Sequence, residues 1–468
     1  MNSIAPSKLT TKAWKKDLIS KYDVAGPRYT SYPTALNFSD DFAAQQYREQ
    51  AEKKRLTSIA PLSLYLHIPF CQNICYYCAC NKIVTRDKSV SRRYLDYLVK
   101  EIALQAPLTS KRRLVTQLHL GGGTPTFLAD AELTELMHHL AHNFKLTDSP
   151  KREYSIEIDP RTINNNTLAL LKGLGFNHLS LGVQDFDPQV QTAINRHQSV
   201  AMIASLTEAA RLYQFKSVSY DLIYGLPFQT PETLITTLQQ VIALAPDRIA
   251  FYNYAHLPER FSSQRTIDRL SLPSAQQKLA MLELISNTLI DAGYLFIGMD
   301  HFVKPDDDLA VAQANGNLQR NFQGYSTCMA PDLIGMGVSA ISSLEQCYAQ
   351  NEKNLDAYYQ KLDKNQLPVA KGLQLSQDDQ LRRRVIHDII CNLELNPKMI
   401  EKEFNCNFSE YFSQPLQALK PLEIDGLIEW QDDKLKVTEY GRSMLRNICM
   451  PFDKYLSNKA SFNYSKAL

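Results

Sequence analysis

Between residues 62 and 255 the sequence alternates short, apolar, β-prone runs with longer amphipathic segments, and no other feature limits the fold as strongly. The runs occupy residues 62–68, 114–120, 154–158, 178–183, 217–223 and 248–254. Runs that are apolar at nearly every position are typical of strands buried on both faces of a parallel sheet. The segments between them carry apolar stripes with helical spacing, such as Leu133, Leu136, Met137 and Leu140.

Six strand–helix units in a row predict an α/β fold with a parallel sheet and with helices outside it. Right-handed connections curl such a sheet into a barrel or part of one. Because a closed barrel of this type has eight units, six units predict an incomplete (β/α)6 TIM-like barrel with a lateral opening. We expect that opening to admit a large, flat substrate.

The 468 residues are enough for two or three domains. We expect an N-terminal arm at 1–55, a catalytic domain at 56–350 with its barrel core at about 62–255, and a mainly helical C-terminal domain at 351–468.

The C-terminal part combines predicted helices with one predicted hairpin. The helices are expected at 378–392, 397–404 and 409–425, and the hairpin at 427–442. Three helices and a hairpin resemble a winged helix, which often binds DNA, but a fold does not fix a function. We favour a lid or docking role over the barrel opening.

Composition excludes several classes of partner. The 51 Lys and Arg residues nearly balance the 49 Asp and Glu residues, so charge favours neither nucleic acid nor an anionic membrane as a partner. No run approaches the roughly 20 apolar residues of a membrane helix, and the N-terminus has no apolar core of a secretory signal. The sequence predicts a soluble, cytoplasmic protein, and nothing in it demands more than a monomer.

Polar residues and glycines follow the ends of the predicted strands. Gly121–Gly123 follow the second run, Glu157 lies near the end of the third, Gln184 follows the fourth, and Asp221 lies near the end of the fifth. In α/β barrels the active site is built at the carboxyl ends of the strands. The sequence therefore predicts an active site at this rim.

Four cysteines follow the first run: Cys71, Cys75 and Cys78, spaced CxxxCxxC, and then Cys80. The spacing allows three thiolates on one short loop to face one point. A structural zinc site takes four ligands, and an iron–sulfur cube usually takes four cysteines. A cube held by three cysteines leaves one iron open to another molecule. A zinc site with Cys80 as the fourth ligand remains an alternative, although zinc knuckles usually come as two separated CxxC halves.

The motifs carry a family resemblance. CxxxCxxC after a first strand and GGTP after a second resemble the radical S-adenosylmethionine (SAM) enzymes. More specifically, the chain resembles the bacterial oxygen-independent coproporphyrinogen III oxidases in PRYTSYPTA (27–35), HIPFCQNICYYCAC, LGGGTPTFL, EIDPRT, LGVQDFD, DLIYGLPFQT, FYNYAHLPERF, GMDHF and NFQGYST. RNICMPFDKYL near the C-terminus also resembles that family, so the resemblance covers essentially the whole chain.

This resemblance implies a cofactor set and a reaction. Cys71, Cys75 and Cys78 would hold a [4Fe–4S] cluster, and SAM would bind its open iron. One electron would break the sulfonium bond, and the 5′-deoxyadenosyl radical would take a hydrogen from a propionate β-carbon. Two propionates of coproporphyrinogen III would each lose carbon dioxide, pass one electron to an acceptor and become a vinyl group, giving protoporphyrinogen IX for haem synthesis. The electron would come from a donor such as a flavodoxin or ferredoxin.

The resemblance also implies roles for individual residues. Contacts to two SAM molecules are expected from Tyr65, Tyr77, Gly122, Gly123, Thr124, Glu157, Gln184, Arg196, Asp221, Ala255 and Ile341. A carboxylate suits the cationic groups of SAM, and a guanidinium suits its carboxylate. Cys80 is not expected to bind the cluster, and we assign it a catalytic role in substrate handling or a place at the second SAM.

Two points stay open in the sequence. Cationic donors for the substrate propionates are sought among Arg28, Arg161, His256 and His301. The main alternative function is a haem-binding chaperone of the same superfamily. Such relatives are shorter, lack the PRYTSYP arm and have no cysteine at the position of Cys80, so the sequence favours the oxidase.

Overall fold

The computed structural model describes residues 18, 21–327 and 330–456. Its internal contacts divide the described chain into two compact units. One unit, here the barrel unit, comprises Phe38–Ser274 and the described residues 330–374. The other, here the helical unit, comprises the described residues up to Asn37, Ala275–Thr327, and residues 375–456. Because each unit joins segments that are distant in sequence, the three-part organisation along the chain stays a prediction.

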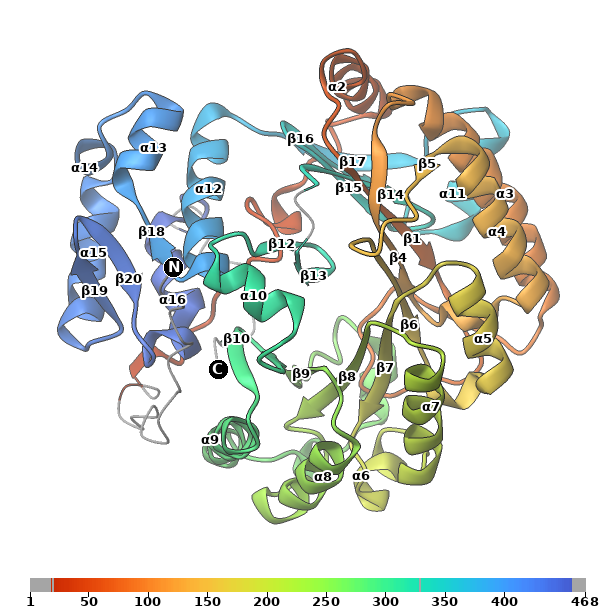
Figure 1. The fold of residues 1–468 in the computed structure, drawn as a ribbon, viewed down its shortest axis with the longest axis horizontal. Coiled ribbons are helices and arrows are strands. Elements are labelled where there is room, and N and C mark those ends of the chain that lie inside the picture. The colour runs from red at the N-terminus through yellow and green to blue at the C-terminus, as the bar shows by residue number, and fades with distance from the viewer. Residues whose placement is uncertain (1–17, 19–20, 328–329, 457–468) are drawn as a thin grey trace. The chain divides into compact units, whose positions relative to one another are not determined.

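A parallel sheet forms the centre of the barrel unit. Its strands are β1 (Leu62–Ile68), β4 (Leu114–Gly122), β6 (Glu153–Ile158), β7 (His178–Gln184), β8 (Ser217–Tyr224) and β9 (Arg248–Asn253). Neighbours pair in the order β9-β8-β7-β6-β4-β1, as Figure 1 shows. Each predicted strand is confirmed, with ends that agree to within two residues.

Helices connect these strands and cover the outer face of the sheet (Figure 1). They are α3 (Ser89–Gln105), α4 (Asp130–Asn143), α5 (Asn165–Gly173), α6 (Pro188–Ala193), α7 (Val200–Leu212) and α8 (Pro231–Leu244). The apolar stripe predicted on α4 is buried. Thr230 caps α8 by accepting a hydrogen bond from the amide of Thr233, and Pro231 occupies the first turn, where a missing N–H costs nothing.

The sheet continues past β1 instead of closing. β14 (Asp332–Met336) pairs in parallel with β1, and β15 (Ile341–Leu344), β16 (Cys347–Asn351) and β17 (Val369–Gln374) follow in antiparallel order. Among the described residues the strand order is linear, which confirms the incomplete barrel. Gly335 leaves no room for a side chain, because a Cβ there would collide with the carbonyl oxygen of Ile341.

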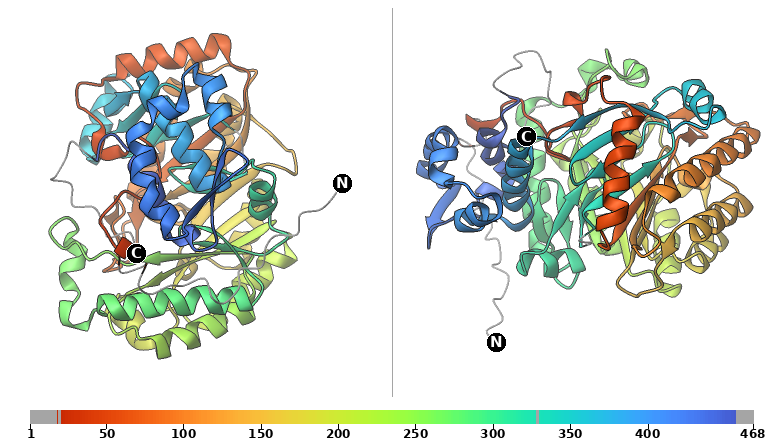
Figure 2. Two further views of the ribbon diagram at one scale, coloured as in Figure 1. Left: turned by 90° about the vertical axis from the view of Figure 1, so that its left-hand side faces the viewer. Right: turned by 90° about the horizontal axis from the view of Figure 1, so that it is seen from above.

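The remaining elements of the barrel unit are short or peripheral. They are α2 (Ala44–Thr57), α11 (Leu355–Asp363), β2 (Phe70–Cys71), β3 (Ile83–Val84) and β5 (Lys145–Leu146). α2, red in Figure 2, packs on β16, where Tyr47 and Ala51 share a buried cluster with Cys347. Part of the segment that was expected to be an arm is therefore a helix on the sheet.

The helical unit contains two groups of elements. The first group is α9 (Ala275–Asp291), β10 (Leu295–Gly298), β11 (His301–Val303), α10 (Asp308–Ala314), β12 (Gln319–Asn321) and β13 (Gly324–Ser326). The second is α12 (Gln377–Asn392), β18 (Glu394–Leu395), α13 (Pro397–Phe404), α14 (Phe408–Tyr411), α15 (Ser413–Ile424), β19 (Ile428–Gln431), β20 (Lys434–Val437) and α16 (Leu445–Cys449). The predicted hairpin is confirmed as β19 and β20, and β18 pairs with β20 on its other side.

The helix predicted at 409–425 is wrong in one respect, because the structure divides it into α14 and α15. Phe412 lies between them with φ −104° and ψ 26° and is fully buried. Pro415 stands in the first turn of α15. Since proline cannot donate the hydrogen bond that a continuing helix needs there, the break is placed by the sequence.

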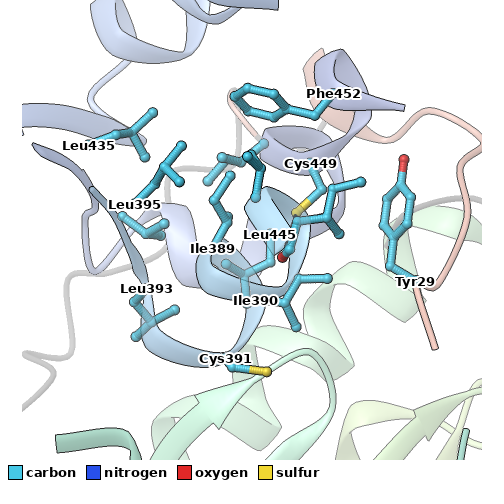
Figure 3. Close-up of a cluster of buried hydrophobic side chains, with 14 of the residues drawn as sticks. Tyr29, Ile389, Ile390, Cys391, Leu393, Leu395, Leu435, Leu445, Cys449 and Phe452 are labelled. Atoms are coloured by element: carbon cyan, nitrogen blue, oxygen red, sulfur yellow. Dashed lines mark hydrogen bonds between the residues drawn. The ribbon is translucent and has the colours of Figure 1, made fainter. Parts of the chain in front are cut away.

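A large apolar core holds the helical unit together (Figure 3). Ile389 of α12, Leu445 of α16 and Phe452 contribute to it, and so does Tyr29 from the N-terminal segment. The hydroxyl of Tyr29 donates to Asp453 across 3.1 Å. The PRYTSYP segment is therefore anchored to the MPFDKYL segment. Among the described helices, none combines the length and the apolar character that crossing a membrane requires.

Candidate active site at the strand ends

The loop after β1 presents four free thiols. The three expected ligands Cys71, Cys75 and Cys78 form no disulfide, and neither does Cys80. The loop is held on one side by the hydroxyl of Thr124, which donates to Sγ of Cys71 across 3.5 Å. On the other side Asn195 donates to the carbonyl oxygen of Ile74 across 2.8 Å. The ends of β4 and α6 thus fix the cysteine loop from both sides.

Neighbouring thiols affect one another's pKa values. Burial raises the pKa of Cys71 to about 11, while Thr124 lowers it and the neighbouring Cys78 and Cys75 raise it further. A hydrogen bond with Cys80 is the main cause that lowers the pKa of Cys78 to about 6, and the same bond raises the pKa of Cys80. Cys80 therefore lies beside Cys78, an expected cluster ligand, and its predicted catalytic role stays a prediction.

The donor set fits an iron–sulfur cluster better than a zinc ion. Within the described ranges no group of three His, Cys, Asp or Glu side chains is placed to hold a single metal ion, and the three cysteines as cluster ligands stay a prediction. Structural zinc requires four donors around a single ion. The cysteines of a cube are spread over the cluster, so three free thiols along one loop suit it.

Two arginines face the middle cysteine. Nη1 of Arg196 lies 3.4 Å and Nη2 of Arg161 lies 3.6 Å from Sγ of Cys75. Asp159 accepts from both, at 3.3 Å from Arg196 and 2.6 Å from Arg161. Burial raises the pKa of Asp159, but Arg196 and then Arg161 outweigh burial and hold it below its ordinary value. Two guanidinium groups, held by one shared carboxylate, thus lie next to the thiol of Cys75.

The glycines after β4 permit close backbone approach. Gly122 has φ +114°, in the left-handed region that favours glycine. A Cβ on Gly123 would lie 2.7 Å from the carbonyl of Pro69. The Gly123 amide donates to Ile68 and the Thr124 amide donates to Phe70, both across 2.8 Å. The predicted SAM-binding loop is therefore bonded to the start of the cysteine loop.

Glu157 is oriented by neighbours on β4. The Gly122 amide donates to its Oε2 across 3.0 Å, and Nε2 of His119 lies 3.1 Å from its Oε1. Burial alone would raise the pKa of Glu157, but the hydrogen bond and the charge interaction with His119 and the bond from Gly122 lower it. The carboxylate is therefore held ionised, as a partner for a cationic ligand.

Tyr65 lies over the same region. Its ring stacks on His119 with centroids 5.8 Å apart, and its hydroxyl lies 3.0 Å from Nδ1 of His67. Nε2 of His67 lies 2.9 Å from the carbonyl oxygen of Asn81. Because a carbonyl only accepts, Nε2 of His67 carries the proton and Tyr65 donates to Nδ1. Burial lowers the pKa of His67, which agrees with a neutral ring.

Gln184 and Arg196 meet over a glycine. A Cβ on Gly182 would lie 2.7 Å from Nη2 of Arg196 and 2.8 Å from Nε2 of Gln184. Gln184 itself has φ +65°, so the end of β7 is bent at the residue that was expected to touch SAM. Arg196 also donates to the carbonyl oxygen of Gly182 across 2.6 Å. The missing side chain at Gly182 thus makes room for two predicted SAM contacts.

Asp221 on β8 is a second carboxyl at the rim. Ser180 on β7 donates to it, and Gly182 is its partner across the strands. Burial raises the pKa of Asp221 to about 6, Ser180 lowers it, and the charge of Glu157 raises it. The two rim carboxyls therefore have pKa values displaced in opposite directions, a pattern that marks distinct roles.

Gln264 joins two further predicted contacts. Its Nε2 donates to the carbonyl oxygen of Tyr77 across 3.0 Å and to that of Ala255 across 3.3 Å. The ring of Tyr77 packs in an apolar cluster with Tyr254. Ile341 lies farther along the sheet, where its carbonyl oxygen covers Gly335, the partner of Tyr65 on β1.

The predicted residues thus gather around the carboxyl ends of the strands. Sequence reasoning placed Asp159 at the rim without a role, and it missed His67, His119 and Gln264 as members of this site. A histidine inside an apolar predicted run, one residue before its end, was the available signal for His67 and His119. Arg161 was sought as a propionate donor, but Asp159 and Cys75 already engage its guanidinium.

The chain matches two family models. Residues 65–241 match the radical SAM superfamily, and residues 375–444 match the HemN C-terminal domain. The second match covers α12 and the hairpin β19–β20, where the sequence resembled a winged helix.

Comparison with known proteins gives full-length relatives. The chain is 48% identical over 98% of its length to the oxygen-independent coproporphyrinogen III oxidase of Pseudomonas aeruginosa, covering 100% of that protein. It is 50% identical over 96% of its length to the Escherichia coli protein of the same name, covering 96% of it. The corresponding Synechocystis protein is 43% identical over 96% of this chain and is covered over 97% of its own length.

A solved structure extends the similarity to the fold. Coproporphyrinogen III oxidase (HemN) from Escherichia coli, described as a radical SAM enzyme, aligns with a TM-score of 0.90 and 48% identity. The alignment covers 94% of this chain and 99% of that protein. The chain therefore belongs to the oxygen-independent coproporphyrinogen III oxidase family of radical SAM enzymes.

Proposed function

We propose that this protein oxidatively decarboxylates two propionate side chains of coproporphyrinogen III to vinyl groups, giving protoporphyrinogen IX without oxygen. The observation that carries the proposal is the set of three free thiols on the loop after β1, in a chain that matches the named oxidases over nearly its full length. Membership of the radical SAM superfamily implies a [4Fe–4S] cluster and SAM.

Cys71, Cys75 and Cys78 would hold the cluster. When bound and reduced, the cluster and SAM supply a 5′-deoxyadenosyl radical that takes a hydrogen from the β-carbon of a propionate. The protein contributes position and shelter from water. Glu157, kept ionised by His119 and the Gly122 amide, is suited to the cationic groups of SAM.

Other residues would hold the remaining parts of SAM. The hydroxyl of Tyr65 donates its hydrogen bond to His67, so its oxygen can accept a hydrogen bond from SAM. The glycines after β4 admit a ligand close to their backbone. Arg196 is a cation for the carboxylate of SAM, although Gly182 and Asp159 occupy part of its donor set. Gln184 and Asp221 complete the rim, and Ile341 adds a contact near Tyr65.

A second SAM molecule is part of the proposal. Tyr77, Gly123 and Thr124 are its expected contacts. We add Ala255 to this group, because Gln264 donates to the carbonyl oxygens of both Tyr77 and Ala255. Cys80 lies next to Cys78 and is exposed, which suits a role in substrate handling more than a role as a ligand.

The setting of the reaction is also proposed. A flavodoxin or ferredoxin would supply the electron. We propose a monomer that works in the cytoplasm. We also propose that it binds neither nucleic acid nor a membrane, because its positive and negative charges nearly balance. A reducing compartment also suits free thiols.

An anaerobic assay tests the function. Reconstituted protein, reduced and incubated with SAM and coproporphyrinogen III under nitrogen, should release 5′-deoxyadenosine and carbon dioxide and should form a vinyl product. Cys75→Ala should abolish both cluster and activity, and Cys80→Ala should keep the cluster spectrum. Stoichiometric haem binding without decarboxylation would instead favour the chaperone.

A further inference from the structure

The strongest feature outside the assigned roles is the pair of guanidinium groups at Cys75. Arg196 was expected to contact SAM, but Arg161 has no assigned part in the proposed function. Nη2 of Arg161 donates to Sγ of Cys75 across 3.6 Å and to Oδ2 of Asp159 across 2.6 Å. Arg161 therefore connects an expected cluster ligand with a buried carboxylate.

The position of Arg161 is fixed from several sides. Nε donates to Oδ1 of Asp159 across 2.9 Å, so the two side chains form a two-point pair. Asp159 also accepts from the Arg161 amide across 3.1 Å. Nη1 donates to the carbonyl oxygen of Asn195 across 3.5 Å. The side chains of Arg161 and Asp159 are only 15% and 12% exposed, so water screens them weakly.

Charge and hydrogen bonding near a cluster control its reduction. Reduction adds one negative charge, and donors to the cluster sulfurs and the net charge nearby set the reduction potential. A cation close to a ligand sulfur stabilises the reduced form more than the oxidised form, and the effect is strong where water is excluded. A nearby carboxylate acts in the opposite sense.

We propose that Arg161 raises the reduction potential of the cluster through its hydrogen bond to Cys75, and that Asp159 limits the rise while holding the guanidinium in place. The arginine thus brings the cluster within reach of its electron donor. This inference rests on the proposed function, because it requires a cluster on Cys71, Cys75 and Cys78.

Substitutions with opposite expected signs test the proposal. Arg161→Gln removes the cation and should shift the midpoint potential to more negative values. We expect the ratio of reduced to oxidised cluster at the original midpoint to fall roughly tenfold, which is about 59 mV for a one-electron couple. Asp159→Asn removes the anion and should shift the midpoint to more positive values. The measurement is a potentiometric titration followed by electron paramagnetic resonance.

A purely structural role would give a different result. If either substitution only loosened the site, the midpoint potentials of Arg161→Gln and Asp159→Asn would shift in the same direction. Shifts of equal sign, or an unchanged midpoint in Arg161→Gln, would therefore overturn the proposal. Arg161→Lys keeps the charge, so its midpoint potential should lie between those of the wild type and Arg161→Gln. Arg211→Gln is the matched control, because Arg211 donates to the Leu244 and Ala245 carbonyls at the end of α8 and no cysteine is involved in those bonds.

Cluster content separates the possible failures. Iron and acid-labile sulfide are measured in every sample before titration. If both Arg161 variants lack a cluster while Arg211→Gln contains one, Arg161 serves assembly and the tuning role is wrong. If the unsubstituted protein itself binds no cluster, the proposed function fails. A normal cluster whose potential ignores Arg161 would defeat this inference alone.

Discussion

Nε2 of His119 on β4 lies 3.1 Å from Oε1 of Glu157 on the neighbouring strand β6. A carboxylate only accepts, so the imidazole donates, and the Gly122 amide occupies the other oxygen. The rim carboxylate is thus oriented by two donors before any ligand arrives. Such preorganisation is what a site for the cationic groups of SAM requires.

His119→Ala should weaken SAM binding without removing the cluster. Losing one hydrogen bond to a charged group costs about 1.5–3 kcal/mol, which corresponds to a loss of affinity of roughly 10- to 100-fold. Isothermal titration of reconstituted protein with SAM measures the change, and iron content serves as the control. An unchanged affinity would show that His119 does not orient Glu157 for SAM.

Gly123→Ala should prevent the cysteine loop from closing on β4. The added Cβ would lie 2.7 Å from both the carbon and the oxygen of the Pro69 carbonyl, which is backbone and cannot turn aside. We expect a loss of about 1–3 kcal/mol in stability and a fall in iron content. Gly173→Ala is the matched control, because nothing lies within 4 Å of its Cβ. Equal iron content in the two variants would contradict the close approach.

The ion pair between Arg113 and Asp332 should contribute strongly to the stability of the barrel unit. Its atoms lie 2.8 Å apart, and the side chains are 3% and 0% exposed. Arg113→Met leaves a buried unpaired carboxylate and should cost about 3–5 kcal/mol in urea unfolding. Lys100→Met removes one partner of the Lys100–Asp363 pair, whose side chains are 47% and 53% exposed, and should cost less than about 1 kcal/mol. Similar losses of stability in both variants would show that burial does not determine how much an ion pair contributes to the stability of this protein.

Glu101 on α3 should make stability depend on pH. Burial raises its pKa to about 7 from 4.5, although Tyr358, the Gly337 amide and Asn351 donate hydrogen bonds that lower it. Between pH 4.5 and 7 the folded protein therefore holds a proton that the unfolded chain has lost. The stabilising effect is complete below pH 4.5 and is lost as the pH rises through 7.

The matched comparison is Glu101→Gln, which cannot titrate. The free energy of unfolding of the wild type, minus that of the variant, should fall by on the order of 3 kcal/mol between pH 4.5 and 7. Urea unfolding at a series of pH values measures this difference. A difference that rises over the same range would mean that the three donors outweigh burial.

Much of the fold could be predicted because local rules agree with tertiary packing. The parallel strands are apolar throughout and the connecting helices are amphipathic, so period and composition point to the same elements. β14 was missed because close backbone contact demanded Gly335, which weakens the strand signal. The break between α14 and α15 could have been read from Pro415, but the apolar pattern continues across it.

The site was predictable where residue type alone indicates chemistry. Cysteines in a short loop and polar residues after apolar strands pointed to the rim before any coordinates. His119, Gln264 and the pairing of Arg161 with Cys75 depend on contacts between segments that are far apart in sequence. Spacing within one segment carries no information about such contacts, so these residues needed the structure.

The central claim is that only three protein sulfurs hold the cluster, so that one iron is left for SAM. The most direct measurement is electron–nuclear double resonance of the reduced, reconstituted protein with SAM labelled with ¹⁷O in its carboxylate. Our account predicts a hyperfine coupling from that oxygen, because the carboxylate would bind the open iron. A fully formed cluster without this coupling, unchanged in spectrum when SAM is added, would show four protein ligands and would contradict the account.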